Sequence, residues 1–312
     1  MSFGTLDNGE TVTRHILKND QLEVAILTYG ATIQSVRFQG GPNMALGFNT
    51  LPEYTAAPTY AGCIIGPVAN RIAHAEAMLN DQNHVFDINE APHCLHSGAT
   101  GFHAKNWAVA EADDTNILLT LTATDGEGGF PANRAIALRY EIVGASLWLT
   151  MLATTDGDTW INMTHHGYWN LDGTRDFAGH QLWVDTDAWV AVDADNIPTQ
   201  VEECPYDFAN TVTLPADPSG EIDHNLCLKP GDKDVRPVAR LTSPKGIVMD
   251  IATSEAGLQV YDGRSLTNPY SHIALETQGF PDAPNRDDFP SVRLNAGETY
   301  GQVTEYRFST AD

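Results

Sequence analysis

Three side chains in this sequence have the chemistry of a proton-transfer site. Glu276 lies in "HIALETQ", which otherwise reads as an apolar strand, and His165 and His166 are adjacent in "INMTHHGYWNLDG". A carboxylate withdrawn from water has a raised pKa and becomes a usable general base near neutral pH. Histidine has an unperturbed pKa of about 6.5, so it can donate or accept a proton in the same range.

The orientation of these side chains depends on the strands that carry them. Successive residues of a strand face opposite sides of a sheet, so we expect one of His165 and His166 in a pocket and the other at the edge of the core or in solvent. The same alternation allows Glu276 to face either the core or solvent. A glutamate that faces a core is rarely buried without a partner. The local sequence therefore identifies a candidate base, Glu276, and two candidate proton donors, and it does not decide which way their side chains face.

Further polar residues stand beside apolar stretches. Arg71 in "GPVANRI" and Asp223 in "EIDHN" could grip hydroxyl groups through several directed hydrogen bonds, and each could equally form an ordinary surface ion pair. No histidines have the H-E-x-x-H spacing of a helical zinc site, so we predict no metal centre. Other histidines and aromatic residues could contact a sugar or belong to the core: His93, His96, His103, His224, Trp107, Tyr168, Trp169 and Phe280.

The elements that must position these residues read as short strands rich in Val, Ile, Leu, Thr and aromatic residues. The predicted strands cover residues 22–38 with a break at Gly30, 117–123, 136–142, 147–155, 181–192, 246–253, 258–263 and 300–308. No long segment has a helical period, and only 51–57 resembles a short helix. Residues 213–237, rich in Pro, Gly and Asp, read as a long loop. We therefore predict an all-β fold, one large antiparallel β-sandwich that forms a single domain over residues 1–312.

The composition limits the partners of this 312-residue chain. It has 17 Lys and Arg against 41 Asp and Glu, a formal net charge of −24. Such a surface disfavours nucleic acid and anionic membranes, which bind proteins through basic residues. No signal peptide is visible, and no apolar run approaches the roughly 20 residues of a membrane span. We read the four separated cysteines as free thiols, and we expect a cytoplasmic protein.

The polar stretches together resemble the aldose 1-epimerase, or galactose mutarotase, family nearly from end to end. The resemblance rests on "LTYGATIQSV" (27–36), "GPVANRI", "CLHSGATGFHAKNW" (94–107), "DGEGGFPAN" (125–133), "NMTHHGYWNLDG", "PYDF" (205–208), "EIDHN", "LQVYDG" and "ALETQGFPDAPN". It implies the galactose mutarotase-like supersandwich, in agreement with the predicted strands. It also implies a free monosaccharide substrate, no cofactor, and a monomer or homodimer.

Carried over residue by residue, the family's catalytic histidine falls on His166 and its catalytic carboxylate on Glu276. Its sugar-binding positions fall on the following residues: Asn70, Arg71, His96, Asp223 and Gln259. The implied reaction interconverts the α and β anomers of free aldoses such as galactose or glucose. Glu276 would accept the proton of the C1 hydroxyl, and protonated His166 would donate a proton to the ring oxygen. The open-chain aldehyde then rotates about C1–C2 and closes again.

The chain departs from the common family pattern near this site. Many relatives have Asn before the catalytic histidine and Ser-Tyr-Phe after it, whereas this chain reads His165-His166-Gly167-Tyr168-Trp169. A second imidazole could alter the surroundings of the proton donor, and Gly167 removes a hydroxyl. The common G-R-Y-x-N-R reads "GPVANR" here. These changes bear on the preferred sugar more than on the reaction.

Two other classes of function remain open at this level. A glycoside hydrolase or lyase on a similar sandwich would need two carboxylates about 5–9 Å apart, for which Asp223 and Glu276 are candidates. A carbohydrate-binding module would keep the aromatic residues without requiring both His166 and Glu276. Release of reducing ends from a glycoside would identify the hydrolase, and absence of any turnover would identify the binding module.

Overall fold

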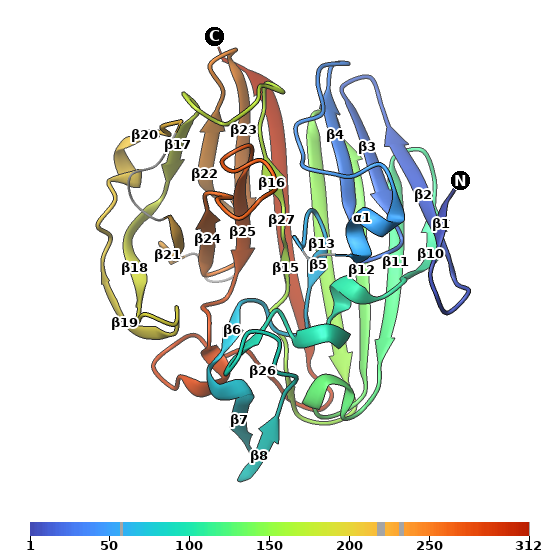
Figure 1. The fold of residues 1–312 in the computed structure, drawn as a ribbon, viewed down its shortest axis with the longest axis vertical. Helices are drawn as coiled ribbons and strands as arrows, with labels where there is room; N and C mark the ends of the chain where they lie inside the picture. The colour runs from blue at the N-terminus through green and yellow to red at the C-terminus, as the bar shows by residue number, and fades with distance from the viewer. Residues whose placement is uncertain (57–58, 217–221, 231–233, 312) are drawn as a thin grey trace.

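The computed structural model describes residues 1–56, 59–216, 222–230 and 234–311 (Figure 1). Antiparallel strands are the main secondary structure of the described chain, which confirms the all-β prediction. A nine-stranded sheet and a six-stranded sheet dominate, and a four-stranded sheet of N-terminal strands lies beside them. None of the helices among the described residues is long and apolar enough to cross a membrane.

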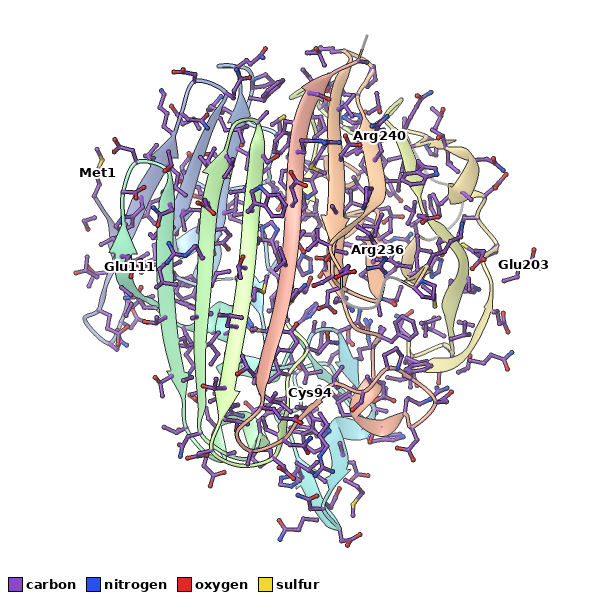
Figure 2. All side chains as sticks on the ribbon, turned by 180° about the vertical axis from the view of Figure 1, so that it is seen from behind. Met1, Cys94, Glu111, Glu203, Arg236 and Arg240 are labelled. Carbon is purple, nitrogen blue, oxygen red and sulfur yellow. The ribbon has the colours of Figure 1, made fainter. Side chains whose placement is uncertain are left out.

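The nine-stranded sheet holds the longest strands, seen side by side from behind in Figure 2. Its order is β10 (Ala108–Ala112), β11 (Asn116–Ala123), β12 (Arg134–Val143), β13 (Ser146–Thr155), β27 (Thr299–Thr310), β23 (Ile247–Thr253), β22 (Arg236–Thr242), β17 (Gln181–Val184) and β20 (Val212–Thr213). Strand β12 shows why the sheet forms, because its side chains alternate between buried and more exposed positions. The buried side chains include Ile136, Leu138 and Tyr140, which belong to the main hydrophobic core.

The six-stranded sheet carries most of the polar residues of interest. Its order is β16 (Tyr168–Trp169), β25 (Ile273–Gln278), β24 (Gly257–Tyr261), β21 (Asp223–Leu228), β18 (Thr186–Val192) and β19 (Pro198–Glu203). The four-stranded sheet contains β1 (Ser2–Thr5), β2 (Thr11–Lys18), β3 (Leu22–Leu27) and β4 (Ile33–Phe38).

Short strand pairs and helical turns complete the described chain. The pairs are β14 (Thr159–Trp160) with β26 (Arg293–Leu294), β15 (Thr164–His165) with β5 (Ile64–Ile65), β6 (Arg71–Ile72) with β9 (Cys94–Leu95), and β7 (Glu76–Leu79) with β8 (Gln82–Val85). The helices are α1 (Leu51–Thr55) and the 3₁₀ turns Ala73–Ala75, Gly98–Thr100, Phe102–Ala104, Glu127–Gly129, Phe208–Asn210 and Ala283–Asn285. Helix α1 lies within the predicted helical segment 51–57, whose last residue is outside the described residues.

A chain of buried hydroxyl groups ties the six-stranded sheet to the nine-stranded sheet. The Oγ1 atoms of Thr277 on β25 and Thr304 on β27 are 2.7 Å apart, and Thr304 Oγ1 lies 3.0 Å from Thr253 Oγ1 on β23. Gln302 donates from Nε2 to the Thr277 carbonyl oxygen at 2.9 Å. Since Thr277 follows Glu276 directly, these bonds hold β25 in place behind the residue predicted as the base.

Two predicted segments differ from the structure. Residues 213–237, predicted as a long loop, contain strand β21 and the start of β22, although 217–221 and 231–233 lie outside the described residues. The prediction was wrong because polar residues occupy the first half of β21, while Leu226 and Leu228 supply only a short apolar signal. The predicted strand 181–192 is broken at Asp185 into β17 and β18, which belong to different sheets.

Candidate active site

One cavity of about 400 Å³ brings every predicted site residue together. Its wall is formed by strands of the six-stranded sheet on one side and by the β6–β9 pair and its flanking turns on the other. The lining residues are Thr59, Tyr60, Asn70, Arg71, Glu90, Leu95, His96, His166, Tyr168, Asp223, Gln259, Tyr261, Ser265, Leu266 and Glu276. Residues far apart in the sequence thus share one polar hollow.

The register of the sheet sets the first wall. Gln259 on β24 pairs with Glu276 on β25, and Asp223 on β21 pairs with Tyr261 on β24. Residues directly opposite in an antiparallel pair face the same side, so their side chains meet in the cavity. Gln259 donates from Nε2 to Asp223 Oδ1 at 2.6 Å, which fixes both side chains.

The second wall is the β6–β9 pair with its flanking residues, which holds Asn70, Arg71 and His96. The Asn70 backbone N–H donates to Nδ1 of His96 at 3.1 Å. Both residues have positive φ angles, 63° for Asn70 and 53° for His96, a conformation that costs free energy in residues other than glycine. Arg71 donates from Nε and Nη2 to the two carboxylate oxygens of Glu90, at 2.5 and 2.9 Å.

The adjacent histidines face opposite sides, as strand alternation predicts. His166 enters the cavity, where its Nε2 lies 3.6 Å from Glu276 Oε1, and the two side chains are only 6% and 3% exposed. His165 points into the core, where its Nδ1 lies 3.1 Å from the Tyr306 hydroxyl. Glu276 therefore faces inward, and the alternative of a solvent-facing glutamate is wrong.

Burial opposes charge on both members of the His166–Glu276 pair. The pKa of His166 is lowered to about 3, chiefly by burial. Burial, together with the negative charge of Asp223, raises the pKa of Glu276 well above its usual range. Burial therefore favours the neutral forms of both side chains, a glutamic acid beside a neutral imidazole.

Aromatic rings surround His166 on the cavity side. The ring of Tyr60 stacks near it with centroids 5.7 Å apart, Tyr168 lies at 4.9 Å and His96 meets it edge-on at 5.3 Å. Burial, followed by the neighbouring imidazoles of His166 and His103, lowers the pKa of His96 well below its ordinary value. The histidines of the cavity are thus held as neutral hydrogen-bonding groups.

Several residues that line the cavity were not predicted from the sequence, and several residues predicted as possible sugar contacts lie elsewhere. Those not predicted include Tyr60, Glu90, Tyr261, Ser265 and Leu266, all of which line the cavity. Glu90 offered a signal, since it stands in "NEAPHCLH" six residues before His96. Three aromatic residues that were proposed to stack on a sugar are buried outside this cavity: Trp107, Trp169 and Phe280. The histidines that lie outside it are His93, His103 and His224.

Gly167 has a packing role that the sequence did not reveal. A Cβ atom at this position would lie 2.6 Å from His165 Cε1 and 2.9 Å from Trp169 Nε1. Real Cβ atoms do not approach other atoms so closely, so the His165 and Trp169 rings require glycine between them. The two departures from the family pattern, His165 and Gly167, are therefore linked by packing in the core. Both lie on the opposite side of the chain from the cavity.

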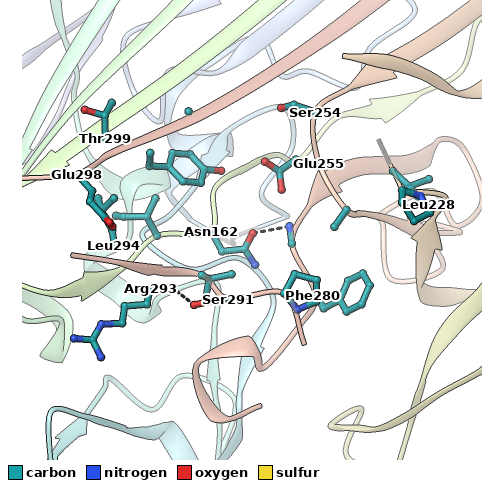
Figure 3. A pocket seen from close by; sticks show the side chains of 18 of the residues that line it. Asn162, Leu228, Ser254, Glu255, Phe280, Ser291, Arg293, Leu294, Glu298 and Thr299 are labelled. Carbon is teal, nitrogen blue, oxygen red and sulfur yellow. Dashed lines mark hydrogen bonds between the residues drawn. The ribbon is translucent and has the colours of Figure 1, made fainter. Parts of the chain in front are cut away.

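A second, larger cavity of about 900 Å³ lies near Asn162, Phe280 and Tyr300 (Figure 3). It contains no histidine, and its arginines are engaged elsewhere. Arg293 points away toward Asn80, to which its Nη2 donates at 2.8 Å, and Arg236 donates to the carbonyl oxygens of Lys229, Thr253 and Glu255. Of these two cavities, as lined by the described residues, only the smaller one combines an imidazole with a buried carboxyl group.

Comparison with known proteins identifies the family of the chain. A family model described as "Aldose 1-epimerase" matches residues 13–307. The chain belongs to the aldose 1-epimerase family. It is therefore an enzyme of the isomerase class, and the family resemblance inferred from the sequence is confirmed.

Relatives and solved structures align over most of the epimerase. It is 32% identical to the galactose mutarotase of Bos taurus, with 99% of this chain and 98% of the relative covered. It is 28% identical to the aldose 1-epimerase of Escherichia coli, with 93% of each covered. An aldose epimerase homologue from C. elegans has a TM-score of 0.89 at 26% identity, covering 96% of this chain and 100% of that chain.

Proposed function

We propose that the protein interconverts the α and β anomers of free aldoses such as galactose or glucose, with Glu276 as the base and His166 as the acid. The observation that carries the proposal is the 3.6 Å approach of His166 Nε2 to Glu276 Oε1 in the 400 Å³ cavity. Asn70, Arg71, His96, Asp223 and Gln259 would bind the sugar hydroxyl groups around this pair.

The short distance between acid and base suits ring opening. Both reacting oxygens, the C1 hydroxyl and the ring oxygen, are bonded to the same carbon, so the two catalytic groups must lie close together. The carboxyl groups of a glycoside hydrolase stand about 5–9 Å apart. The partner of Glu276 is an imidazole rather than a second carboxylate, which favours the epimerase proposal over the hydrolase alternative.

The reaction needs one proton shared by the pair. Transfer of the Glu276 proton to His166 gives carboxylate and imidazolium without changing the number of bound protons. The carboxylate then takes the C1 hydroxyl proton, the imidazolium protonates the ring oxygen, and the bond between C1 and the ring oxygen breaks. After rotation about C1–C2, the reverse transfers close the ring on the other face of the aldehyde. Positioned acid–base groups contribute about 10²–10⁴-fold each.

Polarimetry of freshly dissolved α-anomers tests this function. We expect optical rotation to relax faster than in buffer for at least one aldohexose or aldopentose, without added cofactor and in the presence of a chelator. Relaxation at the buffer rate for every sugar tried would overturn the proposal. Release of reducing ends from a glycoside would instead support the hydrolase alternative.

We also propose that the chain acts as a single domain over residues 1–312, as a monomer or homodimer in the cytoplasm. The family match over residues 13–307 supports one functional unit. The free thiols of Cys63, Cys94, Cys204 and Cys227 fit a reducing compartment. The net charge of −24 supports an uncharged small-molecule substrate rather than nucleic acid or a membrane.

A further inference from the structure

The Arg71–Glu90 pair stands out among the polar contacts of the cavity. Among the described residues that line it, Arg71 is the only lysine or arginine. Its Nε and Nη2 atoms both donate to the Glu90 carboxylate, so Glu90 occupies one complete edge of the guanidinium group. The Arg71 side chain is 12% exposed and that of Glu90 is 40% exposed, which places Glu90 on the solvent side of the pair.

The histidines that line this cavity add no positive charge to that of Arg71 near neutral pH. Burial lowers the pKa values of His96 and His166, so both imidazoles are neutral near pH 7. Asp223 adds a carboxylate, and the whole chain carries a net charge of −24. Glu90 therefore neutralises the positive charge that Arg71 could offer to an anionic ligand.

We propose that Glu90 is a specificity-determining residue that restricts the site to uncharged aldoses. This inference rests on the proposed function. The excluded class consists of anionic aldoses with a free C1 position, such as hexuronates and hexose 6-phosphates. A guanidinium group can bind a carboxylate or phosphate with two parallel hydrogen bonds through its Nη1–Nη2 edge or its Nε–Nη2 edge, and Glu90 occupies the Nε–Nη2 edge. An anion would have to displace Glu90 to reach it.

The remaining guanidinium donors suit neutral ligands. An arginine has five N–H donors in a fixed fork, and the two contacts with Glu90 leave Nη1 to donate to a sugar hydroxyl. With its charge compensated, Arg71 acts as an oriented hydrogen-bond donor rather than as a site for anions. Glu90 thereby sets both the direction and the effective charge of Arg71.

The variant Glu90→Gln tests this role, because glutamine keeps the shape of the side chain and removes its charge. Anomer exchange would be measured by polarimetry for galactose and glucose, and for galacturonate and glucuronate, at low and high salt. We expect the ratio of kcat/KM for uronate over parent sugar to rise about tenfold or more, the gain from one charge-assisted contact. The gain should shrink at high salt, because salt screens the charge of Arg71.

Two control variants separate charge from structure. Glu90→Asp keeps the charge and should keep the wild-type ratio. Glu203→Gln removes an exposed carboxylate from the outer strand β19, labelled in Figure 2, and changes the net charge of the molecule by the same amount. It should leave both activity and ratio unchanged. Glu90→Ser provides a second neutral variant if Glu90→Gln does not fold.

The outcomes distinguish the inference from the function on which it rests. An unchanged uronate ratio in both neutral variants, or an equal loss for neutral and anionic sugars, would show that Glu90 only supports Arg71 and would overturn the inference. A rise in the ratio with Glu203→Gln would assign the effect to net charge and would also overturn it. Absence of turnover of every neutral aldose by the wild-type enzyme would refute the proposed function itself.

Discussion

At the scale of single residues, the structure assigns different surroundings to two adjacent histidines. His166 lies in the cavity 3.6 Å from Glu276, whereas His165 lies in the core against Tyr306 and Trp169. Only one of the two imidazoles can therefore reach a ligand in the cavity. The contrast gives a matched pair of variants that differ by one position in the chain.

We expect Glu276→Gln and His166→Asn to lose about 10²–10⁴-fold in kcat with the fold retained, because each removes one proton-transfer group. His165→Asn should retain most of the activity, since its side chain faces away from the cavity. Polarimetric rates would be measured alongside circular dichroism spectra. Equal loss of activity in both folded histidine variants would show that the two imidazoles act together.

The pH dependence of kcat/KM should reflect a pair that carries one proton. The second proton binds only when His166 is protonated, and its pKa is lowered to about 3. The last proton leaves only above the raised pKa of Glu276. We therefore expect a bell with a wide plateau, whose acid limb lies well below the ordinary histidine pKa of about 6.5 and whose alkaline limb lies well above the ordinary glutamate pKa of about 4.3.

Initial polarimetric rates from α- and β-sugar would define this profile over the pH range in which the protein stays folded. Both anomers should show the same two ionisations, because ring opening and closure use the same pair. An acid limb with an apparent pKa near 6.5 would contradict the effect of burial on His166. A flat profile after correction for buffer catalysis would rule out this acid–base pair.

At the scale of elements, the connection from β15 to β16 joins the core to the cavity. Gly167 lies between His165, which ends β15, and Tyr168, which begins β16 and lines the cavity. Its lack of a side chain leaves space for the rings of His165 and Trp169. The close packing of His165, Gly167 and Trp169 in the core thus fixes the backbone that carries His166.

We expect Gly167→Ser to destabilise the fold by about 1–3 kcal/mol, because the new Cβ overpacks the core. The double variant with His165→Asn should recover part of this loss, since asparagine is smaller than the imidazole ring. Urea unfolding of the wild-type protein, both single variants and the double variant would give the coupling free energy. Strictly additive effects would contradict a shared packing constraint.

At the scale of the whole molecule, burial of histidines links stability to pH. Burial lowers the pKa of His103 and His272 to about 4 and that of His165 and His166 to about 3. The unfolded chain therefore binds more protons than the native protein between these values and about 6.5. Glu276 and Asp282, whose pKa values are raised chiefly by burial, contribute with the opposite sign but are fewer than these histidines.

We expect the free energy of unfolding to decrease as pH falls from 7 to 5, with a slope of up to about 1.4 kcal/mol per pH unit for each such histidine once it is protonated in the unfolded chain. Urea titrations followed by tryptophan fluorescence at pH 7, 6 and 5 would measure this slope. His272→Gln should reduce it, because one linked proton is lost. Constant stability across the range would contradict the proton linkage.

The sequence by itself determined the strand-rich character of the chain, its family and seven of the residues that line the cavity: Asn70, Arg71, His96, His166, Asp223, Gln259 and Glu276. Alternating side chains predict strands because the β-strand period is local, and the motifs around Arg71, His166 and Glu276 are contiguous. The family resemblance already favoured His166 over His165, and tertiary structure decided that His166 lies against Glu276, that Glu276 is buried, and that Glu90 holds Arg71. These outcomes depend on pairings between distant segments, such as Gln259 with Glu276, and on the packing of one sheet against another. A local pattern specifies two faces of a strand, but only its neighbours specify which face meets the core, which meets a cavity and which charges come together there.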